Sequence, residues 1–128
     1  MSWQTGVLQH LRESDLFLEV SLVGGKIRAM IDNSRFLDIH YDPTSQSYSY
    51  ALIDLRLPYP GDKRLFGWDD FPHPGDSSLE NLSSYPHHFQ ERLADGSWQF
   101  TETHFRGNIE TEIVEVLEYL HAYLDIAE

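Results

Sequence analysis

The chain has 128 residues, and its 9 Lys and Arg against 21 Asp and Glu give a formal net charge of −12 with histidine neutral. Globular domains most often hold roughly 100–150 residues, so we expect a single domain over 1–128. The absence of cysteine excludes a disulfide scaffold, thiolate zinc and a cysteine nucleophile, and the absence of an apolar run of ~18 residues or a signal sequence predicts a cytoplasmic protein without a membrane partner.

The first predicted elements are a short helix and a hairpin. Apolar residues at helical spacing predict a helix over 4–12. From Leu16 the apolar period changes to two, which predicts a strand. Gly24 and Gly25 then supply the positive φ angles of a two-residue hairpin turn, so a second strand is expected over 26–31.

The same alternation continues through the middle of the chain. It predicts strands over 35–41, 48–57, 63–68 and 97–105. Turn residues separate the first three of these: an Asp-Pro-Thr-Ser turn at 42–45, and two prolines and a glycine within 58–62. Neighbouring strands joined by short turns indicate antiparallel pairing.

The segment 69–95 differs from the rest of the chain. It is rich in Pro, Ser, His and Asp and has no sustained periodicity. Loops longer than about 12–15 residues in compact domains are usually functional or disordered. Because this loop keeps several apolar residues, we expect it to be ordered and packed, with a short helix over 87–93.

A C-terminal helix is predicted after Asn108, which can cap it. Its apolar stripe must pack on an apolar surface, whereas Glu112, Glu115 and Glu118 are predicted to form a solvated face. The predicted fold class is therefore α+β: an antiparallel, meander-like sheet of five or six strands, with the N-terminal helix and the amphipathic C-terminal helix on one face. A homodimer through the open side of the sheet is expected.

Four of the seven histidines lie in or just after the long loop: His73, His87, His88 and His104. Histidine exchanges protons near neutral pH and is the commonest ligand of borderline metals. Adjacent His87 and His88 cannot point the same way on a strand, and they diverge by about 100° on a helix. At most one of the two is therefore expected in a given site.

Three interpretations of this histidine cluster remain open. In the first, the imidazoles only stabilise the loop by bonding to backbone carbonyls. In the second, His87 or His88 transfers protons while Arg64 or Arg92 holds a phosphate and Tyr85 assists. Metal-free cleavage of RNA needs such groups, because a 2′-hydroxyl loses a proton and the phosphate gains charge.

In the third interpretation the loop binds a divalent metal. His73, His87 or His104 would act with Asp69 or Asp70, a mixed ligand set that suits zinc, manganese or iron. The spacing matches no fixed metal template. There is also no glycine-rich phosphate-binding motif, and we expect no organic cofactor.

Other polar and aromatic residues are interpreted structurally. His40 stands at a strand end before the 42–45 turn, where it could join a site but is better explained by the turn. The aromatic residues Phe66, Trp68, Trp98 and Phe100 alternate along strands and are expected in the core.

The segment 63–90 resembles the TumE-like family of toxin–antitoxin proteins. The run Trp68-Asp69-Asp70-Phe71-Pro72-His73 is similar to the first family element, and Tyr85-Pro86-His87-His88 to the second. Gln90 stands where the family often has a further histidine. The resemblance implies a toxin that is neutralised by a cognate antitoxin protein.

Three functions follow as hypotheses. The first is a toxin that acts on RNA by metal-free catalysis, with site residues His73, His87, His88, Arg64, Arg92, Tyr85 and Asp69. The second is a metal-binding, hydrolase-like module that uses the His/Asp loop. The third is a non-enzymatic acidic interaction protein, suggested by the acidic C-terminal helix.

Overall fold

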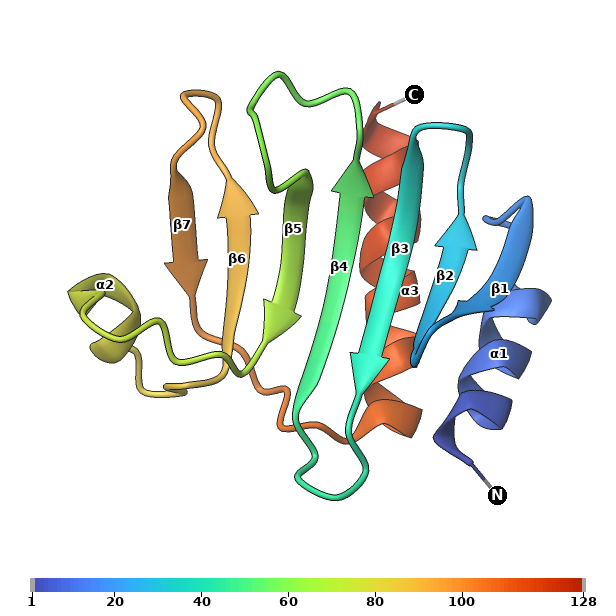
Figure 1. Cartoon of the computed structure of the whole chain (residues 1–128), viewed down its shortest axis with the longest axis horizontal. Coiled ribbons are helices and arrows are strands. Elements are labelled where there is room, and N and C mark those ends of the chain that lie inside the picture. Colours follow the sequence, from blue (N-terminus) through green and yellow to red (C-terminus); the bar gives the residue numbers. More distant parts are fainter. Residues whose placement is uncertain (1, 128) are drawn as a thin grey trace.

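The computed structural model describes residues 2–127, with the side chains of 126 and 127 left out. Its seven strands form one antiparallel sheet in which every strand pairs with the next along the chain (Figure 1). The strands are β1 (Glu19–Val23), β2 (Lys26–Met30), β3 (Arg35–Tyr41), β4 (Tyr48–Asp54), β5 (Arg64–Asp69), β6 (His88–Arg92) and β7 (Trp98–Thr101). The α+β meander is confirmed, with more strands than the five or six expected.

The first hairpin is confirmed, although only Gly24 of its two turn glycines has the expected positive φ. Val23 pairs with Lys26 across a two-residue turn, and Gly24 has φ +63°. Only glycine adopts this left-handed backbone without steric cost. The turn sets the register so that Val20 and Leu22 of β1 face the same side of the sheet as Ile27 and Ala29 of β2.

Two helices, α1 (Trp3–Glu13) and α3 (Ile109–Ala127), cover one face of the sheet and leave the other without a helix (Figure 1). We call these the helix face and the open face. Alternate residues of every central strand point to the helix face because successive side chains in a strand point to opposite sides. The buried core on that side includes Ile27, Leu37, Ile39, Tyr48, Tyr50, Leu52, Phe66, Trp68 and Phe89 from the strands, with Val7, Leu11, Ile113, Val116 and Leu120 from the helices.

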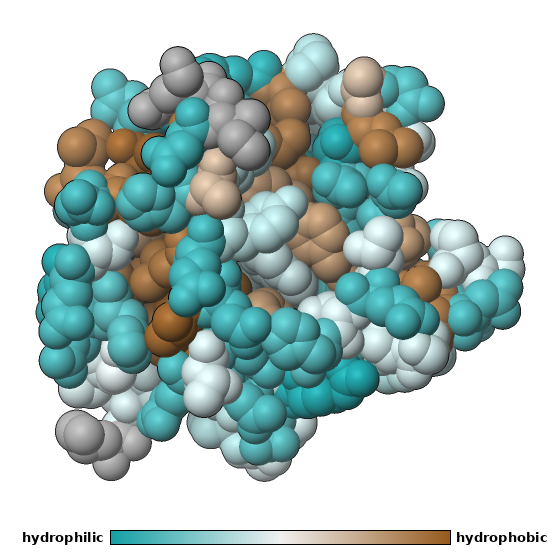
Figure 2. Space-filling model, turned by 180° about the vertical axis from the view of Figure 1, so that it is seen from behind, coloured by the Kyte–Doolittle hydropathy of each residue, from teal (hydrophilic) through white to brown (hydrophobic). Residues whose placement is uncertain are grey.

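Seen from behind, the helices turn polar residues outward, and apolar patches appear between them (Figure 2). The expectation that Glu112 belongs to this solvated face is wrong, because the residue is only 3 % exposed. Its carboxylate accepts the Tyr50 hydroxyl at 2.8 Å and the backbone N–H groups of Arg106, Gly107 and Asn108 at 2.8–3.2 Å. The side chain thus turns back to the start of α3, where unpaired N–H groups and the helix dipole favour an anion.

The helix expected over 87–93 is also wrong, because β6 occupies this part of the chain. Phe89 packs in the core on the helix face, and His88 and Gln90 point to the open face. This alternation has the period of a strand, and β6 is one reason that the sheet exceeds the predicted strand count. The only helix in the long loop is α2 (Ser77–Glu80), which Asp76 caps by accepting two backbone N–H groups.

The loop between β5 and β6 is ordered and packed, as expected, with Leu79 fully buried. Its residues Phe71 and His73 lie against the open face, where the ring of His73 contacts those of His88 and Phe100. Trp98 and Phe100 belong to this open side and are half-buried, so the prediction that they join the core is wrong. None of the helices in residues 2–127 is long and apolar enough to cross a membrane.

Candidate functional site

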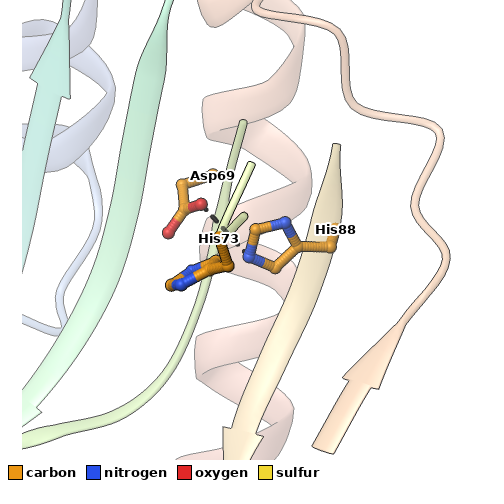
Figure 3. A group of neighbouring side chains, drawn as sticks. All are labelled: Asp69, His73 and His88. Atoms are coloured by element: carbon orange, nitrogen blue, oxygen red, sulfur yellow. Dashed lines mark ion pairs between the residues drawn. The ribbon is translucent and has the colours of Figure 1, made fainter. Parts of the chain in front are cut away.

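One row of paired residues crosses the open face of the sheet. The strand register places His40 of β3 opposite Ser49 of β4, Ser49 opposite Asp69 of β5, and Asp69 opposite His88 of β6. His73 approaches this row from the loop, so that Asp69, His73 and His88 lie together in front of the sheet with α3 behind it (Figure 3). We call these three residues the Asp-His-His cluster.

His88 is fully buried, and hydrogen bonds fix its imidazole at both ends. Its Nδ1 lies 2.8 Å from the carbonyl oxygen of Pro86, which can only accept, so Nδ1 carries a hydrogen. Its Nε2 lies 3.1 Å from Asp69 Oδ1 and 2.9 Å from Gln90 Oε1. The ring therefore presents Nε2 to the cluster and has no surface with which to contact a substrate.

Asp69 is buried with its negative charge compensated. Arg64 donates to Oδ2 at 2.6 Å, and the backbone N–H of Phe71 donates to Oδ1 at 3.0 Å. The same guanidinium donates to Ser49 Oγ at 3.0 Å. Such charge-assisted bonds hold a carboxylate in one orientation, and they leave further guanidinium donors for an anionic ligand.

His73 has the least usual environment of the three residues. Its Nε2 is buried, and it is the one such side-chain nitrogen or oxygen without a hydrogen-bond partner in the described part of the chain. Its backbone has φ +42°, a left-handed conformation that is rare outside glycine. Buried polar atoms without partners and residues in such conformations concentrate at functional sites because both cost free energy.

The Asp-His-His cluster fits a divalent metal ion. One ligand atom from each residue lies within 4.8 Å of the others, and two imidazoles with one carboxylate form a set that binds zinc, iron or manganese. Metal-binding histidines commonly donate their second ring N–H to a backbone carbonyl, as His88 does to Pro86. A metal would also give the buried Nε2 of His73 the partner that it lacks.

The cluster borders an open groove along the sheet. A hollow of about 420 Å³ has His40, Ser49, Arg64, Asp69, His73 and Gln90 among its lining residues. A second hollow of about 240 Å³ continues toward β2 and is lined by Lys26, Asp38, His40, Ser49, Ala51, Ile53, Asp62 and Arg64. The centre of the sheet has small residues here. Ala51 of β4 pairs with Gly67 of β5, and Ser49 of β4 pairs with Asp69, which leaves room for a ligand above them.

His87 lies just before β6 and away from the cluster, which agrees with the expectation that at most one of the two adjacent histidines joins a given site. Its Nδ1 is 3.1 Å from the hydroxyl of Tyr48, a core residue of the helix face, and the two rings are stacked. Burial and the nearby positive charge of Arg106 lower the pKa of His87, so the neutral imidazole is favoured.

The remaining predicted site residues have structural partners or lie elsewhere. Arg92 donates to the backbone carbonyls of Asp62, Arg64 and Gly96, and its guanidinium stacks on Trp98. Tyr85 is exposed on the loop, and exposed His104 bonds to Glu115 at 2.7 Å. Of the seven predicted site residues, the structure brings together Arg64, Asp69, His73 and His88.

Ser49, Gln90 and His40 line the groove although the sequence did not predict them as site residues. A signal was present for Gln90 and Ser49: Gln90 is two residues from His88, and Ser49 alternates with the core tyrosines 48 and 50, so the period of a strand places both on the open face. For His40 the sequence favours a structural explanation, the turn that follows the strand, and only the tertiary structure places this residue at the groove.

No protein-family model, curated protein or solved structure matches this chain.

Proposed function

We propose that the protein is a metal-dependent hydrolase of phosphodiesters, with one divalent transition-metal ion held by Asp69, His73 and His88. The observation that carries this proposal is the convergence of three ligand atoms, one from each residue, in a cluster whose His73 has a buried ring nitrogen without a partner. Metal-free proton transfer by His88 is less well supported because this residue has no exposed surface with which to contact a substrate.

The neighbourhood of the cluster favours an anionic substrate. Arg64 lines both hollows of the groove, and only part of its donor capacity is used by Asp69 and Ser49. A metal ion and an arginine beside one groove are the groups that neutralise charge on a reacting phosphate. Acidic residues elsewhere on this chain of net charge −12 disfavour long nucleic-acid contacts, so a short or single-stranded segment is the expected substrate.

Metal binding is tested directly on untagged protein. We expect about one equivalent of zinc, manganese or iron by elemental analysis, and visible absorption bands of nitrogen- and oxygen-ligated metal after loading with Co²⁺. His73→Asn is expected to weaken metal affinity at least about 100-fold because it removes one of three ligands. His104→Asn, which changes an exposed histidine outside the cluster, is the matched control. Less than about one-tenth equivalent of metal, together with no thermal shift on adding these ions, would falsify the proposal.

A toxin of a toxin–antitoxin pair is the second proposal, and it is compatible with the first. It is favoured by the meeting of the two segments that carry the TumE-like resemblance: Asp69 and His73 come from the first, and His88 from the second. The substrate would then be cytoplasmic RNA, and the partner a cognate antitoxin.

Induced expression in bacteria tests the toxin proposal. Growth arrest by the wild-type chain that His73→Asn relieves, together with degradation of total RNA by the purified metal-loaded protein, is the expected result. Suppose that the protein binds metal, but cells grow normally and RNA stays intact. This outcome would exclude RNA as the substrate and reject the toxin role, while the metal site would stand.

A further inference from the structure

His40 lies across the groove from the Asp-His-His cluster, at the junction of its two hollows. It is exposed at the end of β3 and lines both hollows. The register places it in the same cross-strand row as the cluster, separated from Asp69 by Ser49 of the intervening strand. A ligand that spans the groove would therefore contact the cluster on one side and His40 on the other.

The spacing of the strands suits a phosphate group between His40 and the Asp-His-His cluster. Neighbouring strands lie about 4.8 Å apart, so the backbones of His40 and Asp69 are separated by roughly 10 Å. Side chains extend from both toward the hollow of about 420 Å³ that they share. A hollow of this size lies within the range of small-molecule sites and admits a phosphodiester with its two substituents.

His40 is also the one imidazole on its side of the groove among the described lining residues, and imidazole is the side chain most often used for general acid–base catalysis. Lys26 lies 3.9 Å from Asp38, and Asp38 also pairs with Arg28. Among the described residues that line the hollows, the histidines are His40 and His73, and the latter belongs to the metal ligand set. The imidazole of His40 is therefore left for proton transfer to or from a ligand.

We propose that His40 is the proton donor to the leaving group in phosphodiester hydrolysis, an inference that rests on the proposed function. In this reaction the oxygen of water forms a bond to phosphorus, and the bond from phosphorus to the leaving oxygen breaks. One proton of the water goes to solvent. The leaving oxygen takes its proton from the His40 imidazolium, which solvent then reprotonates.

The test compares two substrates that differ only in the leaving group. Methyl 4-nitrophenyl phosphate releases a weakly basic phenolate that needs little protonation, whereas methyl phenyl phosphate releases a more basic one. With metal-loaded protein, His40→Gln is expected to lower kcat for the phenyl ester by about 100-fold or more, the usual range for a general acid. The nitrophenyl ester should lose less than about 10-fold, because its leaving group is stabilised without a proton.

Two controls accompany this measurement. His121→Gln changes an exposed histidine on α3, outside the groove, and is expected to hydrolyse both esters like the wild type. Metal content and affinity of His40→Gln should equal those of the wild type, because His40 is not a ligand.

The outcomes separate this inference from the proposed function. Equal losses on both esters, or no loss on either, would overturn the role of His40 and leave metal-dependent hydrolysis standing. A wild-type protein that binds metal and hydrolyses neither ester would overturn hydrolysis itself, and the role of His40 with it.

Discussion

The two faces of the sheet bury polar groups in different ways. On the helix face, the Glu112 carboxylate accepts four hydrogen bonds from Tyr50 and the backbone at the start of α3. On the open face, the Nε2 of His73 is buried without a partner beside Asp69 and His88. A satisfied buried group stabilises one conformation, whereas an unsatisfied one costs free energy unless a ligand supplies the missing partner. The helix face thus has a buried polar group that stabilises the fold, whereas the open face has the unsatisfied group on which the proposed ligand binding depends.

The adjacent residues His87 and His88 show the same difference between the two faces. His87 is directed to Tyr48 of the core, and His88 to the Asp-His-His cluster. His88 begins β6 and His87 comes just before it, and the two imidazoles have different surroundings and different expected roles.

The largest expected effect is on the helix face. Glu112→Ala leaves the Tyr50 hydroxyl and three backbone N–H groups without their acceptor, and we expect the free energy of unfolding to fall by about 3–5 kcal/mol. Urea denaturation measures this change. Glu115→Gln, at an exposed position on the same helix, should change stability by less than about 0.5 kcal/mol. Similar effects of the two substitutions would contradict the assignment of stability to the buried carboxylate.

The second prediction concerns the open face and a metal ion. A 100-fold excess of free metal over its Kd should stabilise the folded protein by about 2.7 kcal/mol, seen as a rise in Tm that a chelator reverses. His73→Asn should reduce this stabilisation to about 0.4 kcal/mol or less at the same metal concentration. It should change the stability of the metal-free protein by no more than about 1 kcal/mol, because His73 Nε2 makes no hydrogen bond to the described residues. A large loss of stability without metal would instead make His73 a structural residue.

The third prediction concerns the close approach of β4 and β5 below the groove. A Cβ on Gly67 would lie 2.5 Å from the carbonyl oxygen of Tyr50 and 3.0 Å from the Cα of Ala51. Gly67→Ala should therefore destabilise the protein by about 1–3 kcal/mol, because backbone atoms must move. Gly25→Ala, where nothing lies within 4 Å of the new methyl group, is the control. Thermal unfolding of both variants decides whether this part of the sheet requires glycine.

The smallest expected effect is the pH dependence of His87. Because burial and Arg106 lower its pKa in the folded state, the unfolded chain binds the proton more readily. The stability that neutral His87 contributes is present above the unfolded pKa of about 6.5 and is lost as the pH falls through the lower folded pKa. His87→Gln should lose less stability than the wild type between about pH 7 and pH 5. Parallel pH profiles of the two proteins would contradict this environment for His87.

The fold was largely predictable because its signals are local. Alternating residues and turn chemistry give the register of the first hairpin, and the 3.6-residue period gives α1 and α3. The period failed at β6, where a run of five residues between irregular segments carries too few apolar positions to identify a strand. It failed at Glu112 because a charged residue on a helix is solvated by default, and only the neighbouring loop and Tyr50 provide its buried partners.

The candidate site was also predictable only in part from the sequence. The sequence alone determined the α+β class, a set of seven candidate residues that includes Asp69, His73 and His88, and the rule that His87 and His88 cannot share a site. Its metal interpretation named His87 or His104 beside His73, and the structure puts His88 in that place. The tertiary structure decided that a strand pairing between residues 69 and 88 brings two of them together, that the loop adds the third, and that His40 faces them across the groove. The physical reason is that local periodicity depends on neighbours in the chain, whereas strand pairing joins residues far apart in sequence, which no local pattern encodes.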